Sequence, residues 1–343
     1  MKEPGSDLLA TIRTQPGEAH RLLDDRAVVV EAAAALRGSS RIFLAGTGTS
    51  HHGCLAGEQM LRSAGFDARA VLSFELAAYP PARRPGDSLI VVSHRGTKRF
   101  TIGASEGWGH LLRVLVTGIG SPMTGDHTLT TVAQERSPVH TASHTAALIR
   151  LAQLAAVLAP DGEIAAGLEG LPAAMGAAIA TDRQCAEVVA GLNLDRPLFF
   201  AGAGPSWATA LEGALKIREA AFVTAEGHEL ENLLHGPLIS FDRRDTVVLI
   251  AQPGPSLERT LEAASGLAEI GVALLAVGPA AEEVAGARWA IVTPTLPEVL
   301  APSVNVIPLQ WLAYHGSRAR GVDADSFRRD EPTYLAAQGK FQL

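Results

Sequence analysis

Short runs of apolar residues recur along the chain, and each is followed by a turn that contains glycine and then by a stretch with helical periodicity. The runs include "IFLAG" (42–46), "SLIVVS" (88–93) and "RVLVTG" (113–118). A strand with one face in water alternates apolar and polar residues, whereas these runs are apolar almost throughout. They therefore predict parallel strands covered by helices on both faces, in a doubly wound α/β fold.

Alanine-rich stretches predict further helices outside these strand–turn–helix units. "AVVVEAAAALRG" (27–38) predicts a helix that leads into the first unit. The segment from about 145 to 190, with "LIRLAQLAAVLA" and "LPAAMGAAIA", predicts helices that join the two halves of the chain.

The two halves of the chain repeat each other. "IFLAGTGTSHHGCLAG" (42–57) and "LFFAGAGPSWATALEG" (198–213) are identical at seven of sixteen positions, at an offset of 156. Residues 87–96 fall on 245–254, and 114–118 on 274–278, at offsets of 158 and 160. Three matches in the same order predict two copies of one domain, over residues 1–160 and 161–320, followed by a C-terminal tail over 321–343.

Composition narrows the class of protein. Of the 343 residues, 47% are apolar and 19% charged, which is enough apolar surface for a sizeable core. The two cysteines have neither disulfide nor metal-ligand spacing, so no disulfide framework and no metal site are predicted. A net charge of −7 without a basic run disfavours nucleic acid and anionic membranes as partners. Neither a signal sequence nor an apolar stretch of about 18 residues occurs, which predicts a soluble, cytoplasmic protein.

The first candidate binding loop is "AGTGTSHHG" (45–53), directly after a predicted strand, where α/β sheets bind ligands. It brings Gly48, Thr49 and Ser50 to the start of a helix, whose free N–H groups favour an anion. The third glycine of the dinucleotide-binding fingerprint is missing. On the residues alone, ligand binding and a plain tight turn are equally open.

The second candidate loop is "SHRGTKRFT" (93–101), which carries hydroxyls and up to three cations. Its candidate binding residues are Ser93, His94, Arg95, Gly96, Thr97 and Lys98. They suit a phosphate or a carboxylate, although a basic, solvated turn would have the same composition. The equivalent loop of the second copy, "AQPGPS" (251–256), has no cation, which favours binding by the first copy.

A third segment, "HTASHTAALI" (140–149), predicts the start of a helix. Ser143 and Thr145 stand in its first turns, where hydroxyls serve either as caps or as ligands. Capping alone would explain them.

The stretch "LEGALKIRE" (211–219) places charges on one stripe of a predicted helix. Glu212, Lys216 and Glu219 stand at positions i, i+4 and i+7. The stripe is either a solvated ladder of salt bridges or an acid–base site in a cleft, and the spacing alone does not separate the two.

Together these motifs resemble the sugar isomerase (SIS) family, in particular the isomerase part of glucosamine-6-phosphate synthases. In the first copy, "TGTS" (47–50), "SHRGTK" (93–98) and "ASHT" (142–145) are similar to the family's C-G-T-S, S-x-S-G-x-T and A-S-T-K motifs. In the second copy, "ALEGALKIRE" (210–219) and "LHGPL" (234–238) are similar to A-L-E-G-A-L-K-x-x-E and K-H-G-P. The similarity extends over roughly residues 40–335 and implies two tandem SIS domains, each a doubly wound parallel sheet flanked by helices.

The resemblance implies a role for each matching residue. Ser50, Ser93 and Ser143 would contact the sugar phosphate. Glu219 would be the base that moves a proton between C1 and C2, which requires one carboxylate that reaches both carbons. His235 would open the sugar ring, with Lys216 and Glu212 assisting. We expect Glu212 to engage the Lys216 ammonium, in the favoured orientation of an i, i+4 ion pair, so that Glu219 keeps more of its basicity.

The chain departs from the family pattern at three places. Arg95 and Lys98 stand where the family has serine and threonine. In "DEPTYLAA" (330–337), Thr333 and Ala337 stand where the family tail has arginine and an imine-forming lysine, and Lys340 is the candidate replacement. No glutaminase domain with a cysteine at residue 2 precedes the match, so glutamine-dependent synthase activity is not expected.

The expected function is that of a phosphosugar isomerase or deaminating isomerase, acting on an amino sugar phosphate or a related ketose or aldose phosphate without a cofactor. Two alternatives remain open. One is a fructosamine-phosphate deglycase, in which Arg95 or Lys98 would bind a substrate carboxylate. The other is a non-catalytic sensor of carbohydrate derivatives. The expected partners are a small-molecule sugar phosphate and a second copy of the chain, because the family's ring-opening histidine comes from the neighbouring subunit of a homodimer with shared active sites.

Overall fold

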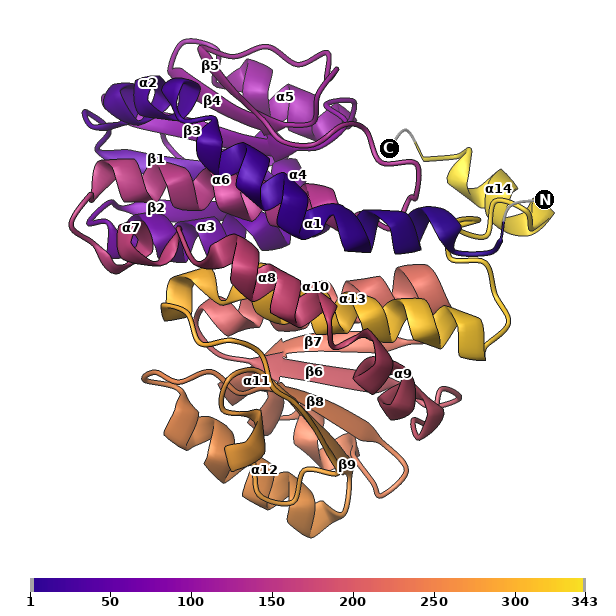
Figure 1. Cartoon of the computed structure of the whole chain (residues 1–343). Coiled ribbons are helices and arrows are strands. Elements are labelled where there is room, and N and C mark those ends of the chain that lie inside the picture. Colours follow the sequence, from indigo (N-terminus) through magenta and orange to yellow (C-terminus); the bar gives the residue numbers. More distant parts are fainter. Residues whose placement is uncertain (1–2, 342–343) are drawn as a thin grey trace. The chain divides into compact units, whose positions relative to one another are not determined.

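The apolar runs form two five-stranded sheets in which all neighbouring strands are parallel (Figure 1). The structure is a computed structural model that describes residues 3–341. The first sheet consists of β1 (Arg41–Gly46), β2 (Ala68–Leu72), β3 (Asp87–Ser93), β4 (Leu112–Thr117) and β5 (His127–Thr130). The second consists of β6 (Leu198–Gly202), β7 (Ala225–Glu229), β8 (Thr246–Ile250), β9 (Ala273–Val277) and β10 (Trp289–Ile291).

Both sheets have the same strand order with respect to the chain. The first sheet runs β2-β1-β3-β4-β5, and the second, read from its β7 edge, runs β7-β6-β8-β9-β10. Strands β1, β3 and β8 are buried at every position, as their unbroken apolar runs predicted. The repeat in the sequence is therefore a repeat in topology, and the predicted α/β fold with two parallel sheets is confirmed.

The chain divides into two compact units, one around each sheet. Of the described residues, the first-sheet unit holds 14–136, 140–170 and 328–341, and the second-sheet unit holds 3–13, 137–139 and 171–327. The predicted division into 1–160, 161–320 and 321–343 follows the order of the chain. The two units, in contrast, also collect segments that are remote in sequence, and they divide the tail after residue 327.

Helices cover the sheets from two sides. In the first-sheet unit, α2 (Ala27–Leu36), α3 (Thr49–Ser63) and α6 (Ala142–Leu158) pack together in one layer, and α4 (Ser73–Ala78) packs with α5 (Arg99–Gly107) in the other. In the second-sheet unit, α10 (Pro205–Ala221) packs against α13 (Pro302–Ala319), and α13 packs against α8 (Leu171–Ile179) and α9 (Asp182–Ala190), whereas α11 (Leu230–Leu234) and α12 (Leu257–Ile270) contact the strands separately. The remaining elements are α1 (Ser6–Asp24), α7 (Glu163–Gly167), α14 (Pro332–Gln338) and the 3₁₀ turns η1 (Pro237–Ser240), η2 (Ala281–Glu283) and η3 (Glu298–Leu300). The alanine-rich stretches are helical as predicted, and α1 is a helix that the pattern did not predict.

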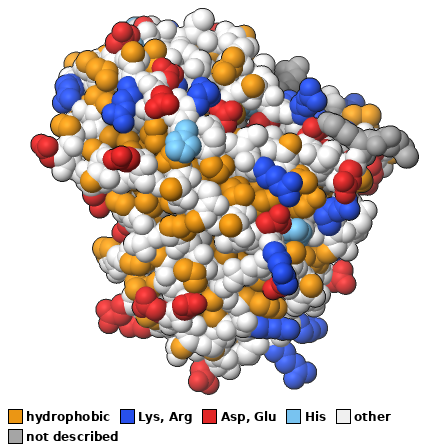
Figure 2. Space-filling model, viewed as in Figure 1, with side chains coloured by type: hydrophobic (Ala, Val, Ile, Leu, Met, Phe, Trp, Pro, Cys, Tyr) orange, Lys and Arg blue, Asp and Glu red, His pale blue; other side chains and the backbone are white. Residues whose placement is uncertain are grey.

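The surface carries charges of both signs. Acidic and basic side chains are scattered over the visible face (Figure 2), in keeping with 36 Asp and Glu against 29 Lys and Arg in the chain. Within residues 3–341, no helix combines the length and the apolar character that crossing a bilayer requires.

The turn after the first strand of each sheet has the same backbone conformation. Gly48 has φ 55° and ψ −129°, and its counterpart Gly204 has φ 54° and ψ −131°. A left-handed φ of this kind strains any residue with a Cβ, which explains the glycine in both copies. The repeat is thus preserved down to individual backbone angles.

A second pair of glycines allows close packing between helices. A Cβ at Gly57 would lie 2.7 Å from Leu151 Cδ1, and a Cβ at the equivalent Gly213 would lie 2.5 Å from Leu309 Cδ1. Real Cβ atoms are almost never found so close to another heavy atom. The glycine of "LEGALK" is therefore explained by packing and needs no catalytic role.

We expect Gly213→Ala to lower the free energy of unfolding by about 1–3 kcal/mol, because the added methyl overpacks a filled contact. Urea denaturation measures the change. Gly266→Ala in α12 is the matched control, since a Cβ there meets nothing within 4 Å. The control should leave stability unchanged or raise it by up to about 1 kcal/mol. Equal effects of the two variants would contradict the packing argument.

Candidate active site

The two predicted binding loops meet at one edge of the first sheet. Strands β1 and β3 are neighbours, while β2 and β4 lie on their outer sides, so the chain leaves this pair in opposite directions. Such a switch point opens a crevice beyond the carboxyl ends of the strands, where α/β sheets bind ligands. The loop of Gly48, Thr49 and Ser50 and the loop over 93–98 flank this point.

The loop after β1 leads directly into a helix. Helix α3 begins at Thr49, and Gly48 is its N-cap residue. Ser50 and Thr49 are half-buried, whereas Gly48 is exposed. The N-terminal turn of a 15-residue helix thus faces the crevice side of the strand, where its dipole favours an anion.

The loop after β3 is shaped by Ser93 and Gly96. Ser93 is buried, and its Oγ accepts a hydrogen bond from the Gly96 N–H at 3.3 Å. Gly96 has φ 67°, and a Cβ there would overlap Ser121 Oγ. The motif therefore folds into a tight turn that only glycine allows, and it leads into Thr97 and Lys98, which have exposed surface.

Three cations gather around this loop. Partial burial, together with repulsion from Arg95 and Arg329, lowers the pKa of Lys98. Arg329 comes from the C-terminal tail, and sequence reasoning missed it because its position carries no local motif. The tail residue chosen instead, Lys340, lies exposed beyond the end of α14. A bound anion would relieve the repulsion among the three cations.

The lowered pKa of Lys98 predicts a pH dependence for anion binding. We expect the affinity for inorganic phosphate to fall as pH rises from about 7 to about 10, earlier than an ordinary lysine would cause, because Lys98 gives up its proton at a lower pH. Lys98→Arg should flatten the profile, because a guanidinium stays protonated over this range. Titration calorimetry across the range measures both profiles, with Lys340→Arg as control. Identical profiles for the wild type and Lys98→Arg would show that Lys98 does not contact the anion.

The equivalent crevice of the second sheet holds a carboxylate. Glu298 Oε2 lies 2.7 Å from the position that a Cβ of Gly254 would take, and Glu298 Oε1 lies 3.8 Å from that of Gly204. A negative charge at this point disfavours a phosphate. The missing cation in 251–256 predicted that the second copy does not bind the anion, and Glu298 strengthens this prediction. The sequence alone had not pointed to Glu298.

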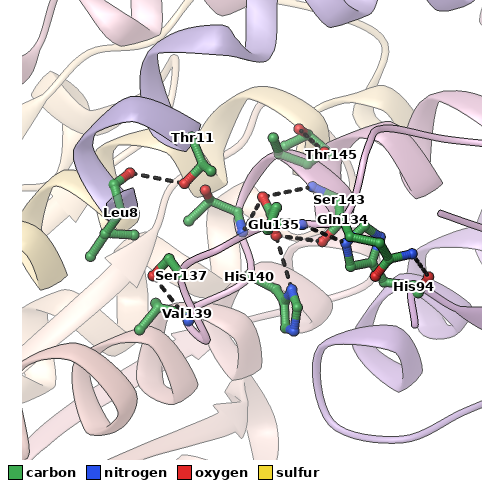
Figure 3. Close-up of polar contacts among 12 residues, drawn as sticks. Leu8, Thr11, His94, Gln134, Glu135, Ser137, Val139, His140, Ser143 and Thr145 are labelled. Carbon is green, nitrogen blue, oxygen red and sulfur yellow. Dashed lines mark hydrogen bonds and ion pairs between the residues drawn. The ribbon is translucent and has the colours of Figure 1, made fainter. Parts of the chain in front are cut away.

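Ser143 does not cap a helix. The N-cap residue of α6 is Thr141, and the Ser143 hydroxyl donates to Glu135 Oε2 at 2.8 Å (Figure 3). The same carboxylate accepts the N–H of Ser143 at 3.2 Å and a hydrogen bond from His140 Nδ1 at 2.9 Å. Thr145 donates to Gln15. The capping interpretation of Ser143 is thus wrong, and its hydroxyl is oriented by a buried glutamate.

His94 turns toward this glutamate and does not add a cation to the loop. Its Nε2 accepts the Glu135 backbone N–H at 3.2 Å, and the Gln134 side chain donates to its carbonyl (Figure 3). Burial lowers the pKa of His94 to about 4, so the imidazole is neutral at pH 7. Burial alone would raise the pKa of Glu135, but the hydrogen bonds from His140 and Ser143 outweigh it and lower that pKa. Of the three cations expected at 93–98, Arg95 and Lys98 remain.

The charged stripe of α10 is buried. The Lys216 side chain has no exposed surface, Glu212 has none, and Glu219 is 17% exposed. Lys216 Nζ lies 3.2 Å from Glu212 Oε1 and 2.5 Å from Glu219 Oε2. Burial disfavours the ammonium, but the attraction of the two carboxylates outweighs it and raises the pKa of Lys216 to about 12. A solvated ladder of salt bridges is therefore excluded.

The expected ion pair of Glu212 with Lys216 is present, and the ammonium also contacts Glu219. Lys216 lies closer to Glu219 than to Glu212. The ammonium is thus shared by the two carboxylates, with the shorter contact to the proposed base. Helix α10 connects two parallel strands and so runs back from their carboxyl ends, which places Glu219, in its last turns, near the amino-terminal edge of the second sheet. The rule that ligands bind at carboxyl ends would not have found this residue.

His235 lies on the surface of the second-sheet unit, just after α11. Its side chain is 72% exposed, and Nε2 lies 2.9 Å from Glu231 Oε1. Hydrogen bonds from Arg259 and His235 lower the pKa of Glu231 to about 2. The imidazole is therefore held by an ionised carboxylate while the rest of the ring faces solvent.

Known proteins share the sequence pattern and the fold of this chain. The SIS domain family matches residues 193–316, the part of the chain that contains β6, α10 and His235. Residues 193–316 are a SIS domain. A glutamine–fructose-6-phosphate aminotransferase [isomerizing] from Gloeobacter violaceus is 30% identical over 348 residues, which cover 94% of this chain and 57% of that protein. The chain, with its SIS domain, is thus homologous to the isomerase portion of that enzyme and spans little more than half of its length.

Solved structures of other proteins have the same fold as nearly the whole of this chain. The C-terminal domain of glucosamine-fructose-6-phosphate aminotransferase from Francisella tularensis has a TM-score of 0.86 at 21% identity, over 93% of this chain and 98% of that one. Glucosamine-6-phosphate deaminase from Thermotoga maritima has a TM-score of 0.78 at 18% identity, over 93% and 97%. At these identities the likeness establishes the paired-sheet fold.

Proposed function

We propose that this protein is a phosphosugar isomerase or deaminating isomerase that acts on an amino sugar phosphate or a related ketose or aldose phosphate. The observation that carries the proposal is the buried triad of α10, in which Glu219 is the member that reaches solvent. Moving a proton between neighbouring carbons needs one carboxylate that takes the proton and returns it. Homology to isomerizing aminotransferases supports an enzyme of the isomerase kind.

In the proposed reaction, Glu219 takes the proton from C2 of the open-chain sugar, and the electron pair forms a double bond between C1 and C2. The electrons of the C1 carbonyl bond move to O1. Return of the proton to C1, with the C2 hydroxyl proton passing to O1, leaves a carbonyl at C2 and completes the isomerisation of an aldose to a ketose. With an amino group at C2, the same transfer leaves an imine at C2, to which water adds while ammonia leaves. Lys216 holds the carboxylate of Glu219 in position through its hydrogen bond, and no cofactor is needed.

The phosphate of the substrate is assigned to the first-sheet unit. The loops of Ser50 and Ser93 offer hydroxyls, N–H groups and a helix N-terminus, and Lys98 with its two neighbouring cations supplies charge. Ser143 is proposed as a further sugar contact. Its hydroxyl donates to Glu135, so an oxygen lone pair is left for a substrate hydroxyl.

His235 is proposed as the group that opens the sugar ring. Its exposure supports a role toward a second copy of the chain, as the resemblance to the family implies. The homodimer stays a prediction, and light scattering on the purified chain measures it.

A deglycase is the second candidate function, favoured by one observation. Arg95, Lys98 and Arg329 together carry three positive charges at one loop, more than one phosphate dianion balances. A substrate with both a phosphate and an amino-acid carboxylate would use all three.

A panel of phosphosugars in D₂O tests the proposal. Hexose, hexosamine and fructosamine phosphates are incubated with the protein, and NMR follows deuterium at C2 while a coupled assay follows ammonia and free amino acid. Deuterium uptake with a ketose or aldose supports an isomerase, ammonia a deaminating isomerase, and amino acid release the deglycase. Tight binding across the panel without exchange or release would contradict catalysis and support a sensor.

A further inference from the structure

Three potential metal ligands converge in the first-sheet unit. His94 follows β3, and Glu135 and His140 stand in the segment before α6 (Figure 3). Each offers one ligand atom, and these atoms all lie within 4.8 Å of one another. Among residues 3–341 this is the single group of three or more such side chains at this spacing. The cluster brings together positions 46 residues apart in the chain that no sequence motif connects.

We propose that His94, Glu135 and His140 bind a divalent transition-metal ion, with Zn²⁺ as the best match. Two imidazoles and one carboxylate are ligands that Zn²⁺ accepts at about 2.0–2.2 Å, with a fourth position left for water. The hard ions Mg²⁺ and Ca²⁺ prefer sites made of oxygen ligands alone. Ligand atoms around a tetrahedral ion lie about 3–3.5 Å apart, so modest side-chain rotations would close the cluster around it.

The orientation of the atoms supports the proposal. Glu135 Oε2 and His140 Nδ1 already face each other at 2.9 Å, and the ion would replace the hydrogen between them. His94 Nε2 faces the same segment, where its lone pair accepts the Glu135 N–H at 3.2 Å, and it would turn from that N–H to the ion on binding. His94 Nδ1 is buried without a hydrogen-bond partner among the described residues. Because Nε2 is an acceptor in this neutral ring, Nδ1 carries the hydrogen, which is the tautomer in which Nε2 can ligate.

The surroundings of Glu135 resemble the outer support of a metal ligand. The N–H groups of Thr141 and Ser143 donate to Oε1 at 3.3 and 3.2 Å. The Ser143 hydroxyl donates to Oε2 at 2.8 Å. Such partners fix the direction of a ligating carboxylate and are needed for tight binding. The other histidine–carboxylate pairs, such as His315 with Asp182, offer one imidazole each.

A bound ion would have a structural consequence. It would connect the residue after Ser93 to the segment that positions Ser143, because His94 and Glu135 are its ligands. We infer that the ion stabilises the loop over 93–98 against the start of α6. This inference does not depend on the proposed isomerase activity.

Zinc binding to the full chain tests the proposal. The purified protein is freed of metal with a chelator and titrated with ZnCl₂ by calorimetry, and Co²⁺ is added separately to observe its visible d–d absorption. We expect one ion per chain, an increase in Tm on Zn²⁺ addition, and Co²⁺ bands typical of four ligands. Glu135→Gln and His140→Asn should each weaken Zn²⁺ binding at least tenfold, whereas His315→Asn should leave it unchanged.

The variants separate ligation from folding. Circular dichroism shows whether each variant keeps the native fold. Because the His140 ring is half-buried and Glu135 is buried, we expect His140→Asn to disturb the fold less than Glu135→Gln does. If Glu135→Gln unfolds, His140→Asn therefore decides. The proposal is overturned if the wild type takes up no Zn²⁺, or if folded His140→Asn binds it as tightly as the wild type does.

Discussion

Glu219→Gln is expected to lower kcat for the proton transfer by about 10²–10⁴-fold, the range that a positioned general base contributes. The amide is nearly the same size as the carboxylate and still accepts a hydrogen bond from Lys216, but it cannot take a proton from carbon. Because a general base acts on the proton in the transition state, the loss should appear in kcat more than in KM. Deuterium exchange at C2 of the best substrate of the panel measures it.

The control for this variant is Glu187→Gln in α9. Glu187 also pairs with a cation on its own helix, Arg183, but both side chains are exposed. It should change kcat by less than about twofold, since exposed pairs contribute little. If Glu219→Gln exchanges deuterium at the wild-type rate, Glu219 is not the base, and the proposed function loses the observation on which it depends.

Lys216→Met is expected to lower the free energy of unfolding by about 3–5 kcal/mol, the effect of breaking a buried ion pair by removing one partner. The methionine fits the space of the lysine stem, so the loss comes from charge. Glu212, which has no exposed surface, and Glu219 would face each other without the ammonium that neutralises them. Urea denaturation measures the difference.

The double variant Glu212→Gln with Lys216→Met separates charge from packing. It removes the fully buried carboxylate together with the lysine, so we expect it to regain at least half of the lost stability. Arg183→Met, on an exposed pair, serves as control and should cost less than about 1 kcal/mol. A double variant as unstable as the single one would show that packing of the lysine stem, not its charge, is what matters.

Much of the architecture was predicted from local patterns. The unbroken apolar runs indicated parallel strands, and the order of the matches at offsets of 156 to 160 indicated the repeat. Both follow from periodicity, because a strand buried on both faces has no polar alternation. Helix α1 was missed although its buried residues, among them Leu8, Ile12 and Ala19, recur at helical spacing, because it contains Pro16, a residue that usually breaks or kinks a helix.

The candidate site was predicted less completely. The loops of Ser50 and Ser93 and the stripe of Glu212, Lys216 and Glu219 were found because each lies within one short segment. Arg329 beside Lys98, and Glu298 in the crevice of the second sheet, were not found. Each of these acts on a loop far away in the chain, and a single sequence contains no record of such contacts.

The sequence by itself determined the strands, the repeat and the spacing of the charged stripe, because all three are periodic properties of neighbouring residues. Only the tertiary structure decided the environment of those residues: that Lys216 lies without exposed surface between two carboxylates, that Ser143 is oriented by Glu135, and that His94 faces His140. The physical reason is that burial and electrostatic interaction depend on distance in space, and the folded chain sets that distance independently of separation along the sequence.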